Sequence, residues 1–218
     1  MRTAVLVVFV VLLQACASTP ERNPVPEELL PQVVVPGIPN ARTTAPRTAD
    51  EVEAMKDHFL VTAAELAAGV GTGPYSDFLA ISGGGSEGAF GAGLLVGWSA
   101  AGTRPEFQVI SGVSTGALIA PFVFAGPEYD DVLETFYTTT DTEDIMDRLG
   151  LVKILRGPAL ADTGPLRKII ATSIDDEFLA KVAAEHRKGR RLVIGTTNLD
   201  AQTPVVWNMG AIAESGQP

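Results

Sequence analysis

The sequence is short of histidine, cysteine and positive charge, and each shortage excludes a class of function. Its only histidines are His58 and His186 and its only cysteine is Cys16, so it lacks the residues for a disulfide framework or for a metal centre built from Cys or His. Sixteen Lys and Arg against 26 Asp and Glu give a net charge of −10. That balance argues against nucleic-acid binding, because a phosphate-binding surface needs local positive charge.

Long hydrophobic runs are also scarce, and the one at the N-terminus is short. Arg2 precedes ten apolar residues, Ala4–Leu13. A membrane-spanning helix needs about 20 such residues, so this run predicts the hydrophobic region of a signal peptide covering residues 1–15. The rest of the chain has the apolar content and length of one domain.

The end of that leader resembles the lipobox of bacterial lipoproteins. The sequence Leu13-Gln14-Ala15-Cys16 places the lone cysteine where cleavage would make it the first residue. The resemblance implies lipid on Cys16 and a membrane anchor, since several acyl chains hold a protein stably at a bilayer. No Asp follows Cys16, which points to the outer membrane of a bacterial cell envelope. An ordinary signal peptide with a chance cysteine is the alternative.

Proline marks the next segment, residues 16–50. Seven of the 15 prolines lie between 17 and 50, and proline disfavours helix and removes hydrogen-bond donors. We therefore predict an extended tether here, with Val33-Val34-Val35 resting on a domain that covers residues 51–218.

From residue 51 the pattern alternates between apolar strands and helices. Strands are predicted at 78–81, 107–110, 191–196 and 205–207, and helices at 50–70, 89–101, 117–124, 130–138, 165–172 and 176–188. Strands separated by helices predict a three-layer α/β/α fold with a mainly parallel sheet covered on both faces. The apolar helices at 89–101 and 117–124 are expected to be packed on this sheet rather than to bind a membrane, because each directly follows a strand.

The first glycine motif, Gly83–Gly88, has the form G-x-G-x-x-G between a strand and a helix. A dinucleotide site would need an acidic residue at the end of the second strand. That strand ends Ile110-Ser111-Gly112, and Glu106 stands at its other end. The sequence therefore disfavours NAD or FAD, and without a Lys-Ser or Lys-Thr pair after the glycines it also excludes a Walker-type phosphate loop.

The second motif is G-x-S-x-G, formed by Gly112, Ser114 and Gly116 between a strand and a helix. This context is typical of a nucleophile elbow, in which a sharp turn lifts the serine above the sheet at a helix N-terminus. A glycine-rich turn with an incidental serine is the alternative.

The two motifs together are more informative than either one. Both follow strands of a parallel sheet, where open α/β sheets place their sites. If the strands are neighbours, Gly83, Gly84 and Gly85 can offer backbone amides to the oxyanion formed when Ser114 attacks an acyl group. The alternative for the triple glycine is close helix packing alone.

The two motifs resemble those of the patatin-like phospholipases. The resemblance rests on Leu79-Ala80-Ile81-Ser82-Gly83-Gly84-Gly85-Ser86-Glu87-Gly88-Ala89-Phe90 and Ile110-Ser111-Gly112-Val113-Ser114-Thr115-Gly116-Ala117. It implies a Ser–Asp dyad without histidine that cleaves lipid acyl esters without a cofactor or metal. Ser114 would be the nucleophile, and the loop containing Gly83, Gly84, Gly85 and Gly88 would be the oxyanion hole. The chain departs from many members at Ser82 and Glu87, where they carry Asp and a basic residue.

The base that activates the serine is not evident in the sequence. The resemblance implies an Asp in an Asp-Gly motif, and this sequence contains no Asp-Gly. We expect the dyad Asp beyond Pro218 and little hydrolase activity from 218 residues alone. Asp200 is the strongest candidate within the chain, although a turn position explains it better. His186 lies in a charge run expected to be solvated, at the sheet edge opposite Ser114.

Two functions follow from this pattern. The first is a lipid-anchored serine acyl hydrolase whose partners are a lipid or acyl-ester substrate and, through Cys16, a membrane. The second is a non-catalytic lipoprotein that keeps the fold as a binding or structural module. An α/β-hydrolase esterase that uses His186 is a third.

Overall fold

The computed structural model places the site within one of two compact units. Residues Val25–Thr139 and Ile174–Pro218 form the unit that contains the main sheet, and Met1–Pro24 with Thr140–Ser173 forms the other. The structure describes residues 23–45, 48–53, 77–139, 147–148, 161–162 and 164–216. The leader, Cys16 and most of the helix predicted at 50–70 lie outside these residues.

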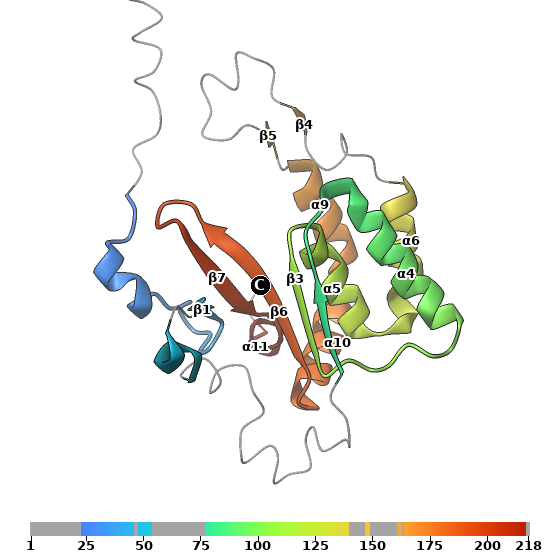
Figure 1. Cartoon of the computed structure of the whole chain (residues 1–218), viewed down its shortest axis with the longest axis horizontal. Helices are drawn as coiled ribbons and strands as arrows, with labels where there is room; N and C mark the ends of the chain where they lie inside the picture. The colour runs from blue at the N-terminus through green and yellow to red at the C-terminus, as the bar shows by residue number, and fades with distance from the viewer. Residues whose placement is uncertain are drawn as a thin grey trace, which may run out of the picture. The chain divides into compact units, whose positions relative to one another are not determined.

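The main sheet has five strands in the order β1-β7-β6-β3-β2 (Figure 1). They are β1 (Arg42–Thr44), β2 (Phe78–Ile81), β3 (Val109–Val113), β6 (Arg191–Asn198) and β7 (Thr203–Asn208). Strands β2, β3 and β6 are parallel, whereas β7 runs antiparallel to both of its neighbours. The predicted α/β fold with a mainly parallel sheet is confirmed.

The register of the parallel strands brings the two glycine motifs to the same edge. Ile81 at the end of β2 lies opposite Gly112, and Val113 at the end of β3 lies opposite Gly195 of β6. The segments after β2 and β3 therefore leave the sheet side by side, as the positions of the two glycine motifs predicted.

Helices follow the strands and cover the sheet. They are α4 (Gly88–Ala100), α5 (Thr115–Ala125), α6 (Asp130–Thr139), α10 (Asp176–Arg187) and α11 (Met209–Glu214). The connections β2–α4–β3 and β3–α5–β6 each move to the next strand in the same direction across the sheet. Because such crossovers are right-handed, both helices lie on the same face of the sheet. There α4 packs on α5 and α6, and α10 packs on α5 and α11. The expected third layer stays a prediction.

Shorter elements complete the described chain. The sheet unit also contains the 3-10 turns η2 (Glu27–Gln32), η3 (Gly85–Glu87) and η4 (Pro127–Tyr129). The other unit contains β4 (Asp147–Arg148), which pairs antiparallel with β5 (Ala161–Asp162), and α9 (Gly164–Ser173).

The core lies between the sheet and α5. Ile110, Ile119, Phe124, Leu133 and Leu192 are its largest fully buried side chains. Nearly every residue of α5 is buried, which explains why this helix carries no charged residue on any face.

Part of the predicted tether belongs to the sheet unit. β1, within the proline-rich segment, pairs with β7 as an edge strand. Leu30, Ile38 and Ala41 are buried, whereas Val34 is exposed. The prediction of an extended tether up to residue 50 is therefore wrong for 42–44, because backbone pairing and three apolar anchors hold the segment against the domain.

Helix α4 is less buried than the sequence predicted. Its inner face buries Ala92 and Leu95, but Phe90, Leu94 and Trp98 are exposed. The sequence pattern was misleading because both faces of this helix are apolar.

The charge run near His186 was predicted to be solvated, but only part of it is: Arg187 and Lys188 are exposed, whereas Glu185, Arg190 and Arg191 are buried. The side chains of Glu185 and Arg190 are only 4% and 6% exposed, and Arg190 Nη1 lies 3.0 Å from Glu185 Oε2. The same guanidinium donates 2.9 Å hydrogen bonds to the carbonyl oxygens of Phe107 and Phe124. Since the Phe124 carbonyl belongs to the last turn of α5, the buried arginine satisfies an acceptor that the helix leaves open.

Replacing Glu185 with Gln should lower the free energy of unfolding by about 3 kcal/mol, because breaking a buried ion pair leaves the arginine charge uncompensated. Urea denaturation measures this. Glu128→Gln is the matched control: Glu128 pairs with Lys181 at 2.8 Å but is 52% exposed, so its loss should cost well under 1 kcal/mol. Equal effects would contradict the role assigned to the buried pair.

Acid should weaken the same pair. Burial alone would raise the pKa of Glu185, but hydrogen bonds from Lys188 and Arg190 outweigh burial and hold the pKa below its ordinary value of 4.5. The pair's contribution is thus complete above pH 4.5 and is lost as the pH falls through the lower, folded-state pKa, because the unfolded chain takes up the proton first. Glu185→Gln should reduce this loss of stability.

Candidate active site

Ser114 stands at the junction between β3 and α5. Its backbone has φ 53° and ψ −124°, a conformation that non-glycine residues rarely adopt, and the residue is exposed. Such a conformation costs about 1–3 kcal/mol and persists only where the surroundings enforce it. The segment Gly112–Gly116, here called the elbow, therefore holds a serine at the N-terminus of a buried helix instead of turning it into the core.

The two elbow glycines lie where the backbone comes closest to itself. A β carbon on Gly112 would overlap the carbonyl of Gly116. A β carbon on Gly116 would overlap the carbonyl of Ile81 and lie 2.9 Å from the carbonyl oxygen of Ser82. Only glycine fits at either position, so the elbow packs directly on the end of β2.

The segment Gly83–Gly88, here called the glycine loop, lies beside the elbow. A β carbon on Gly83 would be 2.9 Å from Ser114 Cβ and 3.5 Å from its Oγ. At the other end of the loop, a β carbon on Gly88 would overlap the side chain of Thr115. Both ends of the loop therefore contact the elbow.

The middle of the glycine loop, unlike its two ends, has no close contact with the elbow among the nearest atoms of Gly84 and Gly85. Gly84 precedes the turn η3, and a β carbon there would lie 3.3 Å from Glu87 Cβ. Gly85 has φ +58°, and a β carbon there would meet nothing within 4 Å. Glycine at this position is therefore explained by the positive φ angle and not by a close contact.

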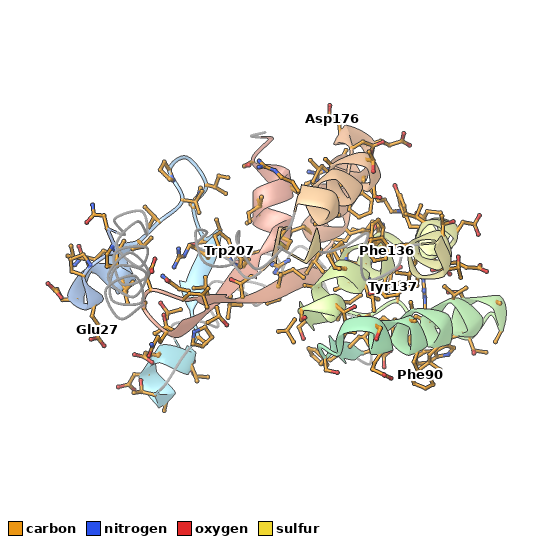
Figure 2. All side chains as sticks on the ribbon, turned by 90° about the horizontal axis from the view of Figure 1, so that it is seen from above. Glu27, Phe90, Phe136, Tyr137, Asp176 and Trp207 are labelled. Atoms are coloured by element: carbon orange, nitrogen blue, oxygen red, sulfur yellow. The ribbon has the colours of Figure 1, made fainter. Side chains whose placement is uncertain are left out.

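Tyr137 of α6 contacts the elbow, although no motif in the sequence indicated this residue. Its hydroxyl lies 2.6 Å from Thr115 Oγ1 and donates to the Thr115 carbonyl oxygen at 3.3 Å. Burial raises the pKa of Tyr137 above 10.0, so the phenol stays protonated at neutral pH and keeps its donor. Figure 2 shows Tyr137 beside Phe136 on this helix. Thr115 is thus held between Gly88 and Tyr137.

Asp200 is in a turn beyond the elbow. Strand β6 continues three residues past Gly195, the partner of Val113, before the turn to β7. At about 3.3 Å per residue, the strand extends roughly 10 Å beyond the level of the elbow. The amides of Asp200 and Ala201 both donate to Asn198 Oδ1. These two hydrogen bonds agree with the turn interpretation of Asp200.

His186 lies at the opposite edge of the sheet, as predicted. It is in the last turn of α10, which leads to the N-terminal end of β6. The expectation of a surface residue is corrected, because His186 is half-buried and its ring lies against Gly210, where a β carbon would overlap it.

Neither a metal-binding cluster nor a membrane-spanning helix is present among the described residues. In that part of the chain, no group of three or more His, Cys, Asp or Glu is placed to hold a metal ion. No helix there is long and apolar enough to cross a membrane.

Comparison with known families decides the classification. The profile of the patatin-like phospholipases matches residues 79–210, more than half of the chain. The chain belongs to the patatin-like phospholipase family. The match runs from β2 through both glycine motifs to the start of α11, and the family is one of lipid acyl hydrolases. No curated protein and no solved structure matches the chain significantly.

Gly116→Ala tests the close contact between the elbow and β2. We expect it to lower the free energy of unfolding by about 2 kcal/mol or more, because the added methyl would overlap backbone that has no room to move. Gly93→Ala is the control, since a β carbon there meets nothing within 4 Å in mid-helix and should stabilise by about 0.5–1 kcal/mol. Urea denaturation measures the free energy of unfolding of both variants. A Gly116→Ala variant that is as stable as the wild type would contradict the close contact between the elbow and β2.

Proposed function

We propose that this chain is a serine acyl hydrolase that cleaves lipid acyl esters, with Ser114 as the nucleophile. The observation that carries the proposal is the placement of an exposed serine, in an enforced positive-φ conformation, with Gly83 against its side chain. The family supports lipid acyl esters as the substrate class. No metal or cofactor takes part in the proposed reaction.

The proposed reaction has two steps. Ser114 Oγ attacks the acyl carbonyl carbon while its proton passes to an aspartate, and the resulting oxyanion is bound by amides of the glycine loop. The intermediate collapses to an acyl-serine as the alcohol leaves with a proton. Water then attacks the acyl-serine by the same route, releasing the fatty acid and restoring Ser114. One oxyanion donor typically contributes 10²–10³ in rate.

Two features of the described site favour this chemistry. Ser114 precedes the first turn of α5, an 11-residue helix whose N-terminal dipole favours negative charge developing there. The glycine loop carries no side chain at Gly83, Gly84 and Gly85, so their backbone can approach a substrate closely.

The aspartate of the dyad is not assigned to Asp200. That residue follows Asn198 in the turn between β6 and β7, and the hydrogen bonds there explain its position. This placement also favours the second candidate function, a non-catalytic lipoprotein that retains the fold. In both cases we propose that Cys16 carries lipid and holds the protein at a bacterial membrane.

Ser114→Ala should abolish labelling by a fluorophosphonate probe, because the probe reacts only with an activated serine hydroxyl. Circular dichroism should show an intact fold. Asp200→Asn is the matched control and should keep the label, since the turn position gives its carboxylate no part in the reaction.

Three results would count against this account. Labelling that survives in Ser114→Ala would refute Ser114 as the nucleophile. Loss of labelling in Asp200→Asn would reassign the base to Asp200. A wild-type chain that takes up no label would mean either that these 218 residues lack the activating aspartate, as the missing Asp-Gly motif predicts, or that the fold is non-catalytic; labelling of a chain extended beyond Pro218 would decide between the two.

A further inference from the structure

Helix α4 has an exposed face without charge. Residues 88–103 contain no Asp, Glu, Lys or Arg. Phe90, Leu94 and Trp98 are 78%, 57% and 37% exposed, and their spacing of four residues puts them on one stripe of the helix. Figure 2 shows Phe90 on the outer side of α4. These three side chains are here called the α4 stripe.

The surface around the α4 stripe is also apolar or small. Ala89, Gly93 and Gly97 are exposed beside it, so Phe90 and Leu94 project from a helix surface with few other large side chains. The Trp98 ring lies edge-on to the buried Phe107, with 5.9 Å between the ring centroids, and is only partly exposed. The first charged residue after the helix, Arg104, has a side chain only 4% exposed and lies 2.9 Å from Asp130. The charge of Arg104 is therefore buried in an ion pair with Asp130 and is not part of the exposed surface around the stripe. Three large apolar groups on one exposed face indicate an interaction surface rather than scattered surface residues.

The position of the α4 stripe points to one kind of partner. Helix α4 begins at Gly88, where the glycine loop contacts Thr115 next to Ser114. Phe90 follows two residues later, about 200° around the helix, so the stripe begins within one turn of the contact with the elbow but on the outer face of α4. Val113, the residue before Ser114, is also 47% exposed. Exposed apolar side chains are thus present both in the elbow and on α4, the helix that follows the glycine loop.

We propose that the α4 stripe docks on the surface of a lipid aggregate and so presents Ser114 to acyl chains. This inference rests on the proposed function, which requires the acyl ester to come from lipid. Because the stripe is uncharged and the chain carries a net charge of −10, binding depends on apolar insertion, and a zwitterionic surface suits it better than an anionic one. Trp98, an amphipathic ring at one end of the stripe, suits the interfacial zone.

The two tryptophans of the chain allow a direct test. Trp98 belongs to the stripe, whereas Trp207 lies on β7, donates to Thr196 Oγ1 at 2.8 Å and has the Arg42 guanidinium 5.4 Å from its ring centroid. Trp207→Phe and Trp98→Phe, each combined with Ser114→Ala, leave one reporter apiece in a protein that cannot consume the lipid. Each is mixed with phosphatidylcholine vesicles that carry bromine on the acyl chains, which quench only a tryptophan inserted among those chains.

We expect vesicles to blue-shift and quench Trp98 and to leave Trp207 unchanged. Adding Phe90→Gln and Leu94→Gln to the Trp98 reporter should reduce the quenching several-fold. The contrast between the reporters makes the test independent of binding through the N-terminal segment, which carries no tryptophan.

Three outcomes would overturn the proposal. If the protein sediments with vesicles while Trp98 stays unquenched, the stripe does not dock. Equal quenching of both reporters would mean that insertion is not specific to α4. A blue shift of Trp98 that grows with protein concentration in the absence of lipid would assign the stripe to a second copy of the chain. Since every reporter carries Ser114→Ala, quenching is measured without catalysis, and a failure of Ser114 to react would refute the proposed function while leaving this result intact.

Discussion

The site depends on one close contact between two stretches of backbone. The elbow rests on the end of β2, with Gly116 against the carbonyls of Ile81 and Ser82. Parallel pairing of β2 with β3 brings the two segments together, and the lack of a β carbon lets them touch. The same contact places Gly83 beside Ser114, so the fold and the candidate chemistry have one physical origin.

Buried polar groups hold both ends of α5, the helix that follows the elbow. At its first turn Tyr137 hydrogen-bonds Thr115. At its last turn Arg190 donates to the Phe124 carbonyl and pairs with Glu185. Because nearly all of α5 is buried, its terminal groups have little access to water and require protein partners. Side chains from α6 and from the segment after α10 therefore satisfy polar groups at both ends of the helix that follows Ser114.

Local motifs were predictable from the sequence and long-range polar contacts were not. The spacing of the glycine motifs indicated the sheet edge and the neighbouring loops, because each motif fixes its own turn. Arg190 looked like a solvated charge because two of its partners, the carbonyls of Phe107 and Phe124, lie 83 and 66 residues away. Tyr137 had no local signal for the same reason. Helix α4 was misjudged because an apolar pattern does not say which face the fold covers.

The most direct test of the central claim is the structure of the protein after reaction with an alkyl phosphonate, whose phosphoryl oxygen mimics the oxyanion. The account predicts a bond from phosphorus to Ser114 Oγ and a phosphoryl oxygen about 2.7–3.1 Å from amide nitrogens of the glycine loop. Phosphonate attached to another residue, or a phosphoryl oxygen directed away from Gly83, Gly84 and Gly85, would contradict it.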